Sequence, residues 1–375
     1  MGKLGEYITE YSEKNINNEY RPVAVGKYGI RSRESIYKKE LAADYSKNKV
    51  IFKNTLTVGM GSKQIDIGIL SDDRKFSVSP AYRTYKISGI NSNYLEFCLQ
   101  AKNKEMFERY VKQSARQGKT IDFKRWLEFE IPVPNESIQS QIVESLENIK
   151  NLITCQEEEL DLMNELVKAR FVEMFGNILC DNNLPRVQLS KLANIGSSKR
   201  IYANEYVNSG VPFYRSKEIR ELGTGLKPSV ELFIKQERYD EIKEKYGVPK
   251  IGDILIAAIG ATIGYSWIVD TNNPFYYKDG NLIILSIKDN VNPIFLNHTM
   301  GILIDDFKNK GVAGSAQLAL TIEKLEKMMV VNPDIELQNQ FADFVKQLDK
   351  SKVAVQKALD EAQLLFDSLM QKYFG

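Results

Sequence analysis

Apolar residues recur at alternating intervals of four and three positions in two long stretches of the chain, residues 134–176 and 333–375. Sustained spacing of this kind is typical of the seam of a coiled coil. About 36 helical residues at 1.5 Å per residue would make each helix roughly 54 Å long. The seam positions that carry polar residues are Gln156, Arg170 and Lys352.

The two stretches are copies of each other at an offset of 199 residues, with eight of 43 aligned positions identical and no gap. Asn135 and Asp334 follow the opening prolines, where they would cap the helices. Gly176 and Gly375 occupy the place of a helix-ending glycine. A gapless repeat of this length indicates an internally duplicated fold. Two such helices in one chain most simply pack on each other, in an antiparallel arrangement.

The segments between these stretches mix strand and helix patterns. β-branched and aromatic runs bounded by Gly, Asn and Ser predict strands, and periodic apolar runs predict helices. We expect strands within residues 20–90, 208–219, 250–269 and 275–287, and helices over residues 94–115, 121–130 and 292–311. Residues 2–15 resemble residues 188–200, with Leu4 matching Leu189, so the repeated unit is expected to begin with an opening helix.

The predicted fold class is therefore α+β with a pseudo-two-fold internal repeat. Two mixed α/β domains would be joined by two long antiparallel coiled-coil helices. The expected divisions are a first domain over 1–133, a first helix over 134–176, a second domain over 177–332 and a second helix over 333–375.

The composition is that of an ordinary globular protein, with 43% hydrophobic and 27% charged residues in a chain of 375. The three cysteines, Cys98, Cys155 and Cys180, form no CxxC pair and cannot all be bridged. We therefore expect a reducing, cytoplasmic environment. The sequence contains neither a secretory signal nor an apolar run of membrane length.

Motifs for catalysis are missing from the sequence. The Gly-rich residues 260–264 are not followed by Lys-Ser/Thr, so they do not form a phosphate-binding loop. Asn273-Pro274-Phe275 lacks the second proline expected of an adenine methyltransferase. His298 is the only histidine, which argues against a zinc cluster and a histidine-based triad. We expect no catalytic residues and no metal site.

The charge of the chain is unevenly distributed. Residues 134–176 hold nine acidic and three basic side chains and residues 333–375 hold seven and five, so a total of +2 leaves +10 on the rest. A basic remainder beside acidic helices favours a polyanionic partner. Loops of both mixed domains carry the candidate DNA-binding residues: Lys14, Arg31, Arg33, Ser62, Lys63, Gln64, Arg116, Lys119, Ser198, Lys199, Arg200, Arg215, Lys217, Tyr277 and Lys278.

Side-chain chemistry divides these candidates into two kinds. Arg215 and Lys217, at a strand-to-turn position, would reach the major groove, and Lys63 and Gln64, on a Gly-Ser turn, would read a base. Lys14 and Lys199, at equivalent positions of the repeat, would hold phosphates.

The helix-start sequences IPVPNESIQSQIVESLENI and VVNPDIELQNQFADFVKQL, together with the ends FVEMFG and LMQKYFG, carry a resemblance to a known family. The chain resembles the specificity subunit of type I restriction-modification enzymes over essentially its whole length. Gln139 and Gln338 match the family's usual glutamine, whereas Ile138 and Leu337 replace the glutamate that usually precedes it.

The resemblance implies a non-catalytic subunit whose two target-recognition domains each read one half of a bipartite double-stranded DNA site. It implies that the helices set the spacer and dock two methylation subunits, with restriction subunits joining through the complex. Partner subunits would bind S-adenosylmethionine, ATP and Mg, and this chain would bind no cofactor and no membrane.

Three alternatives remain open from the sequence. The chain could provide DNA specificity to another, type II-like modification system, and co-purifying partners would separate that reading. It could be a coiled-coil scaffold without a DNA role, which would lack salt-sensitive binding to random duplex. An enzyme in its own right is disfavoured by the missing motifs.

Overall fold

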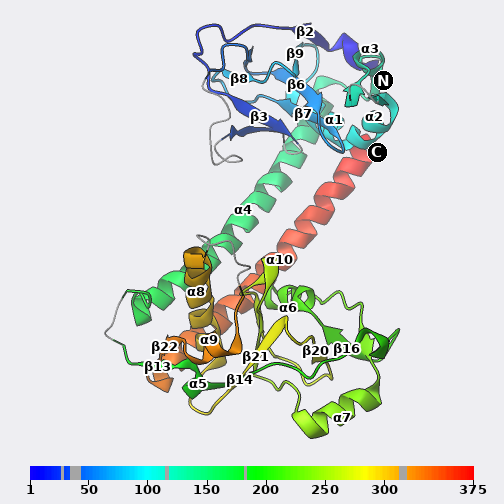
Figure 1. Cartoon of the computed structure of the whole chain (residues 1–375). Helices are drawn as coiled ribbons and strands as arrows, with labels where there is room; N and C mark the ends of the chain where they lie inside the picture. The colour runs from blue at the N-terminus through cyan, green and yellow to red at the C-terminus, as the bar shows by residue number, and fades with distance from the viewer. Residues whose placement is uncertain (27–28, 34–43, 115–117, 181–183, 312–318) are drawn as a thin grey trace. The chain divides into compact units, whose positions relative to one another are not determined.

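The computed structural model describes residues 1–26, 29–33, 44–114, 118–180, 184–311 and 319–375 (Figure 1). The chain divides into two compact units, one formed by Met1–Glu159 with Val355–Gly375 and the other by Leu160–Ala354. Both divisions fall inside long helices, α4 (Glu136–Phe175) and α10 (Ile335–Phe374). Each unit therefore contains a mixed domain, the start of one long helix and the end of the other.

The first unit is built on an antiparallel four-stranded sheet with the order β2-β9-β6-β7. These strands are β2 (Ile8–Tyr11), β6 (Thr55–Met60), β7 (Ile65–Ile69) and β9 (Arg83–Ile87). Smaller pairs surround it: β1 (Gly2–Lys3) with β12 (Glu130–Ile131), β3 (Val23–Gly26) with β4 (Gly29–Ser32), β5 (Lys49–Ile51) with β8 (Phe76–Val78), and β10 (Val111–Ser114) with β11 (Gly118–Ile121).

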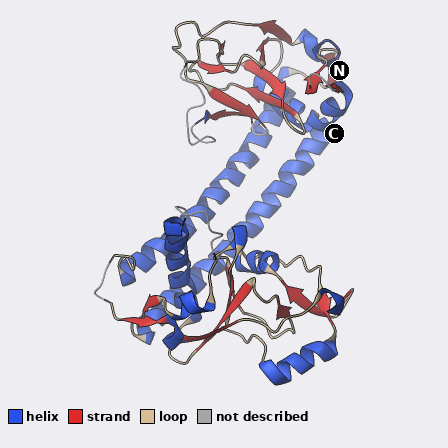
Figure 2. Cartoon of the chain, viewed as in Figure 1, coloured by secondary structure: helices blue, strands red, loops and turns tan. Residues whose placement is uncertain are grey.

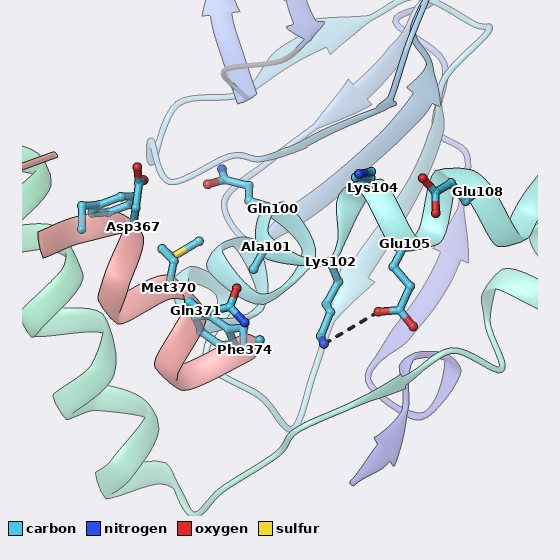
Figure 3. A pocket seen from close by; sticks show the side chains of 12 residues that line it. Gln100, Ala101, Lys102, Lys104, Glu105, Glu108, Asp367, Met370, Gln371 and Phe374 are labelled. Carbon is cyan, nitrogen blue, oxygen red and sulfur yellow. Dashed lines mark ion pairs between the residues drawn. The ribbon is translucent and has the colours of Figure 1, made fainter. Parts of the chain in front are cut away.

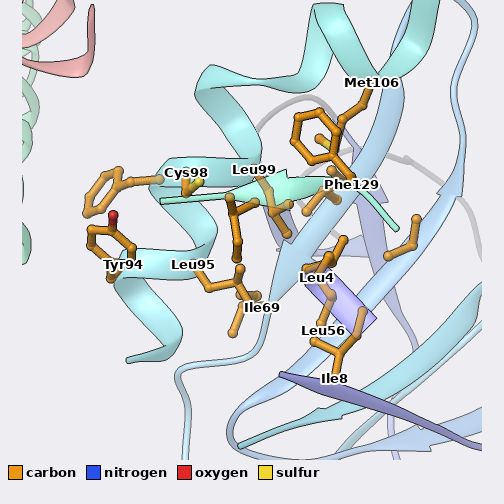
Figure 4. Packing of buried hydrophobic residues seen from close by; sticks show 14 of the residues in the cluster. Leu4, Ile8, Leu56, Ile69, Tyr94, Leu95, Cys98, Leu99, Met106 and Phe129 are labelled. Atoms are coloured by element: carbon orange, nitrogen blue, oxygen red, sulfur yellow. The ribbon is translucent and has the colours of Figure 1, made fainter. Parts of the chain in front are cut away.

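Helix α1 (Ser92–Ala101) packs against this sheet, and Leu95 and Leu99 of α1 join Leu56 and Ile69 of the strands in one core (Figure 4). All four side chains are buried. Burying a leucine or isoleucine side chain contributes about 1.5–3 kcal/mol, so this layer is a main source of the unit's stability.

The single helix predicted over 94–115 is wrong. Helix α1 ends at Ala101, α2 (Asn103–Tyr110) follows after Lys102, and the strand β10 begins at Val111. Helix α3 (Phe123–Trp126) is the short helix expected next. The break occurs because the side chain of Asn103 bonds the backbone of Ile65, accepting from its N–H at 3.1 Å and donating to its carbonyl at 2.8 Å. A long-range contact therefore overrides the local periodicity.

The second unit repeats the same sheet order, β14-β21-β18-β19, with strands β14 (Ala193–Gly196), β18 (Ile254–Ala257), β19 (Ser266–Ile268) and β21 (Leu282–Ile287). Strand β18 is covered on both faces, because Leu255 lies in one core cluster and Ile254 and Ile256 lie in another. That burial explains its continuous apolar run. Helix α8 (Pro293–Gly311) takes the place of α1.

A second sheet of this unit has the order β15-β17-β16-β20, shown with the other strands in red in Figure 2. Its strands are β15 (Tyr206–Val207), β16 (Val211–Tyr214), β17 (Phe233–Ile234) and β20 (Tyr276–Tyr277). The remaining elements are α5 (Leu189–Leu192), α6 (Ser216–Gly223), α7 (Gln236–Tyr246), α9 (Ile322–Glu326), β13 (Arg186–Gln188), β22 (Met329–Val331), η3 (Ala203–Glu205) and η4 (Gly260–Thr262).

The opening helices expected in each copy are single turns, η1 (Leu4–Glu6) and α5, each followed by the first strand of a sheet. The predicted match of Leu4 with Leu189 is confirmed. Both side chains are fully buried, and the backbone N–H of each donates at 2.9 Å to a carbonyl of equivalent position, that of Phe129 or Met328.

The long helices follow the predicted heptads, since each predicted seam position from Ile142 to Met174 and from Phe341 to Tyr373 is buried or half-buried. Helix α4 begins with Asn135 accepting from the N–H of Ile138 at 2.9 Å. It ends at Phe175 and is followed by Gly176, whose φ of +69° favours glycine.

The two helices run antiparallel. In the first unit, Phe374 at the end of α10 shares a core with Ile142 and Leu146 near the start of α4. In the second unit, Phe171 at the end of α4 packs against Phe341 near the start of α10, with ring centroids 5.3 Å apart. The fold class predicted from the sequence is confirmed.

Candidate nucleic-acid interface

In the second unit, the loop after β14 meets the loop after β20. The backbone N–H of Lys199 donates to the Tyr276 hydroxyl at 2.6 Å, and the guanidinium of Arg200 pairs with Asp279 at 2.7 Å. The ammonium of Lys199 lies 5.0 Å from the ring centroid of Tyr246, an arrangement that favours the cation. Lys199 and Arg200 are exposed and Ser198 is half-buried, so this corner presents two cations to solvent.

The turn that follows β16 joins the same region, because the N–H of Lys278 donates to the carbonyl of Tyr214 at 2.9 Å. Strands β16 and β20 run parallel, with Tyr214 beside Tyr277. The structure therefore brings together three loops that are far apart in sequence, around residues 198–200, 215–217 and 276–279.

Arg215 is held by carboxylates at the start of α6. Its backbone N–H donates to Glu218 at 2.7 Å, and its guanidinium contacts Glu218 and Glu231, each at 2.9 Å. The Glu218 side chain is fully buried, whereas that of Arg215 is 28% exposed. Hydrogen bonds to Glu218 and, to a smaller extent, to Glu231 raise the pKa of Arg215. Arg215 therefore neutralises a buried carboxylate, whatever else it contacts.

Lys217 shares one of these partners. Its ammonium lies 2.8 Å from Glu231, and its side chain is 45% exposed. Hydrogen bonds from Lys217 and Arg215 lower the pKa of Glu231 to about 2, so this carboxylate stays charged at neutral pH. Lys217 is the more accessible of the two cations predicted for the major groove.

Tyr277 does not present its side chain to solvent. The residue is 4% exposed, and its ring lies in a core cluster with Phe213 and Trp267. Burial raises the pKa of its hydroxyl. Tyr276, the other residue of β20, is buried in the same cluster. The prediction of a DNA contact therefore fits the half-buried neighbour Lys278 better.

In the first unit, the turn between β6 and β7 lies beside the β10–β11 hairpin. The ammonium of Lys119 donates to the carbonyl of Ser62 at 2.6 Å and lies 5.3 Å from the ring centroid of Phe107. The N–H of Gly61 donates to the carbonyl of Gln64 at 3.1 Å, which closes the turn. Ser62, Lys63, Gln64 and Lys119 thus form one cluster, and Arg116 lies outside the described residues.

The other candidates of the first unit are spread over neighbouring strands. Arg31 is exposed on β4, a strand that packs beside β7. The guanidinium of Arg33 lies 5.5 Å from the ring centroid of Tyr45. Lys14 is exposed, and its backbone forms an isolated antiparallel β-bridge with that of Lys49. Lys14 and Lys199 each follow the first strand of the shared sheet, as expected from the repeat.

Two carboxylates of the second unit belong to this region although the sequence did not predict them as part of it. Glu231 links Arg215 to Lys217, and Asp279 pairs with Arg200 across 79 residues. Sequence spacing gives no sign of either pairing, because the partners meet only when the sheets form. These carboxylates tune how much positive charge the loops present.

Among the residues placed in the structure, His, Cys, Asp and Glu side chains do not gather in groups of three or more that could hold a metal ion. Within the same residues, the helices are too short or too polar to cross a membrane.

The same α+β sheet order is present twice, each time attached to a long antiparallel helix pair. The chain therefore belongs to the class of internally duplicated proteins whose two modules carry different basic loops. The model of the type I restriction modification DNA specificity domain matches residues 3–164 and again residues 185–362. The chain belongs to this family, and the resemblance noted from its helix sequences is confirmed.

Relatives agree with this assignment. S.HindORF215P of Haemophilus influenzae, provisionally named a type I restriction enzyme specificity subunit, is 29% identical over 250 residues. That match covers 65% of this chain and spans 61% of the relative's length.

Solved structures share the fold. The S subunit of a type I restriction-modification system from M. genitalium matches 100% of this chain and 95% of its own, with a TM-score of 0.59 and 14% identity. A structure reported for complex assembly and conformational transition of the type I R-M system matches 100% and 96%, with a TM-score of 0.57 and 16% identity.

Proposed function

We propose that this chain is the sequence-specific DNA-recognition subunit of a type I restriction-modification complex, and that each mixed domain reads one half of a bipartite site. The observation that carries the proposal is the duplication of one sheet order, β2-β9-β6-β7 and β14-β21-β18-β19, with different basic loops on each copy. A shared frame with unlike loops suits two readers of unlike sequences.

The loop chemistry supports a division of labour. Exposed lysines such as Lys199 and Lys14 suit phosphates, which fix position without reading sequence. Gln64, on a turn beside Lys63, has an amide that can pair with adenine in the major groove. Lys217, half-exposed beside Glu231, is the candidate in the second unit for a guanine contact.

The long helices supply the second part of the proposal, a ruler. Each contains 40 residues, a length of about 60 Å at 1.5 Å per residue. Their acidic surface disfavours contact with phosphates between the half-sites. We propose that this helix length sets the unread spacer.

The helices also carry apolar side chains outside their seam, where methylation subunits would dock. Leu162 and Leu166 of α4 are 69% and 49% exposed, and Leu364 and Leu365 of α10 are 70% and 50% exposed. Leu166 and Leu365 occupy the same position of the repeat. Two apolar patches that share this one position suit two copies of one partner.

In this proposal the chain itself is non-catalytic and acts in the cytoplasm. Methylation subunits would bind S-adenosylmethionine, and restriction subunits, where present, would use ATP and Mg. The chain's contribution is to choose the DNA sequence and to place its partners on it.

The proposal is tested by expressing the chain with its methylation subunit and sequencing the adenines methylated in cellular DNA. We expect a motif of two defined half-sites separated by an unread spacer of fixed length. The methylation subunit alone is the control and should give no such motif. A motif without a spacer, or one that persists without this chain, would contradict the proposal.

Binding to random duplex separates the proposal from a protein scaffold. DNA recognition predicts measurable binding at low salt that falls steeply as salt rises, because bound phosphates release counterions. A scaffold would show neither property.

A further inference from the structure

Each mixed domain is fastened to the start of its own long helix by a buried glutamine. In the first unit, Gln139 is 4% exposed. Its Oε1 accepts from the backbone N–H of Asn91 at 2.9 Å, and its Nε2 donates to the carbonyl of Pro134 at 2.8 Å. The amide therefore joins the domain to the first turn of α4.

The second unit repeats this contact atom for atom. Gln338 is 1% exposed, accepts from the N–H of Asn292 at 2.9 Å and donates to the carbonyl of Pro333 at 2.8 Å. The mixed domains differ in most of their sequence, yet both keep an asparagine at the contacted position. The shared geometry therefore indicates a requirement common to both domains.

The residue that each glutamine contacts is itself a helix cap. The side chain of Asn91 accepts from the N–H of Tyr94 at 3.1 Å at the start of α1. The side chain of Asn292 accepts from the N–H of Ile294 at 2.9 Å at the start of α8. Because α1 packs under the first sheet and α8 takes its place in the second unit, each glutamine is coupled to a whole domain through one helix end.

A second attachment lies one helical turn further along α1 and α8. There each of these helices contacts the end of the other long helix. The ring of Tyr94 in α1 lies 5.3 Å from that of Phe374, at the end of α10. The ring of Phe295 in α8 lies 4.8 Å from that of Phe175, at the end of α4. Phe175 and Phe374 are equivalent in the repeat, and both are buried.

Figure 3 shows the end of α10, with Met370, Gln371 and Phe374, lying against the corner between α1 and α2. A groove of about 670 Å³ remains beside this contact. The side chains that contribute charge to it include Lys102 and Glu105, which pair at 3.7 Å. Hydrogen bonds are directional, so the polar contact at Gln139 restricts the angle between the domain and the helix more tightly than the apolar aromatic contact does.

We infer that Gln139 and Gln338 are positioning residues that fix the angle between each recognition domain and the helix pair, and thereby make the complex selective for one spacer length. This inference rests on the proposed function and adds to it. Helix length would set which spacer is preferred, and the glutamines would set how strictly neighbouring lengths are rejected.

The variants that test it are Gln139→Met, Gln338→Met and the double variant, each assembled with the methylation subunit. Methionine keeps the volume of the side chain and removes both hydrogen bonds. Gln141→Met and Gln340→Met are matched controls, since these glutamines lie half a turn away and are exposed. Methylation is measured on a DNA library with constant half-sites and spacers one or two base pairs longer or shorter.

We expect the preference of the wild type for its best spacer over its neighbours to fall about fivefold in each single variant, which corresponds to about 1 kcal/mol, and further in the double variant. Half-site base preferences should remain close to wild type, and the controls should keep the wild-type profile. The melting temperature should fall in the Gln139 and Gln338 variants, because backbone groups lose their buried partners. Should Gln139→Met fail to fold, Phe374→Leu loosens the other attachment of the same domain and should broaden the profile in the same way.

The contrary outcomes are distinct. A wild type with spacer selectivity and variants with an unchanged profile would overturn this inference alone. Variants that lose half-site reading without any change in relative spacer preference would do the same, since they would show a structural role only. A wild type without any bipartite preference would overturn the proposed function, and the inference with it.

Discussion

The two mixed domains share a frame and differ in what is inserted into it. Between β2 and β6 of its sheet, the first domain places the β3–β4 hairpin and β5. Between the equivalent strands β14 and β18, the second domain places β15 to β17 with α6 and α7. A further strand precedes the last sheet strand in both, β8 pairing antiparallel with β5 and β20 pairing parallel with β16.

The candidate DNA residues follow the same division. Most of them lie in the inserted segments or in the turns beside them, such as Arg31 on β4, Arg215 and Lys217 after β16, and Lys278 after β20. The contacts that attach the domains to the helices lie in the shared frame. We therefore expect spacing and sequence reading to be carried by different parts of each domain, so that each can be altered without the other.

The largest expected effect comes from shortening the two long helices. Removing one heptad from the middle of each helix, residues 150–156 and 356–362, keeps the seam in register and shortens both helices by about 10 Å. At 3.4 Å per base pair, the preferred spacer should become about three base pairs shorter while both half-sites stay the same. Methylome sequencing measures this, and an unchanged spacer would exclude the helices as a ruler.

Arg215→Ala should affect the second domain alone. It leaves the buried Glu218 without its guanidinium partner, so we expect the free energy of unfolding of the second unit to fall by about 3 kcal/mol. The two tryptophans report the units separately, since Trp126 lies in the first core and Trp267 in the second. Fluorescence-detected unfolding in a Trp126→Phe background should show the loss, and a Trp267→Phe background should not.

A double variant then separates structure from reading at this position. Arg215→Met with Glu218→Leu replaces the pair by apolar groups and should regain most of the stability. If Arg215→Ala loses recognition of the second half-site and the double variant does not restore it, Arg215 reads a base. Recovery of both stability and the half-site would remove Arg215 from the DNA contacts.

Gln64→Ala should change one half-site and spare the other. Loss of a bidentate amide contact costs about 1–3 kcal/mol of discrimination at one base pair. We expect relaxed preference at a single position of the first half-site, measured by binding selection from a randomised library. Gln141→Ala is the control, and a change in the second half-site would contradict the division of labour.

Lys199→Ala should weaken binding to all duplexes alike. Removing one phosphate contact lowers the slope of log K against log salt by about one without changing the preferred sequence. Lys350→Ala removes the same charge from the exposed surface of α10 and serves as the control. A change of sequence preference at Lys199 would assign it to a base instead.

The smallest effect is a pH dependence confined to the second unit. His298 packs against Phe341 with ring centroids 5.3 Å apart, and burial lowers the pKa of its imidazole, with Asp349 opposing the shift and Lys352 adding to it. The unfolded chain therefore binds a proton more readily, and stability falls as pH drops through about 6.5.

The first unit has Phe97 at the corresponding position, three residues after the aromatic attachment. His298→Phe should therefore make the second unit behave like the first and reduce the loss of stability between pH 7 and 5, as followed by Trp267 fluorescence. An unchanged pH profile would assign that loss to other groups.

Local patterns in the sequence predicted the features that depend on neighbouring residues. The heptads from Ile142 to Met174, the cap at Asn135 and the ending glycine Gly176 depend on spacing along one helix, so each was predictable. The apolar runs of β18 and β21 were likewise recognisable as strands. The repeat itself revealed the symmetry of the fold.

Features that join distant residues were not predictable in the same way. Asn103 ends α1 early because it bonds Ile65, and Tyr277 is buried because Phe213 and Trp267 join it in one core. The bond between Gln139 and Asn91 spans 48 residues. A single sequence does not reveal such partners, since they are set by the order of strands in the sheet.

The division of the chain between the units has a consequence for its synthesis. The second unit is continuous, Leu160–Ala354, whereas the first needs residues from both ends of the sequence. As the ribosome proceeds from the N-terminus, the domain translated first waits for Phe366 and Phe374, which cover Phe97 and Tyr94. The domain made second can thus complete its core before the domain made first.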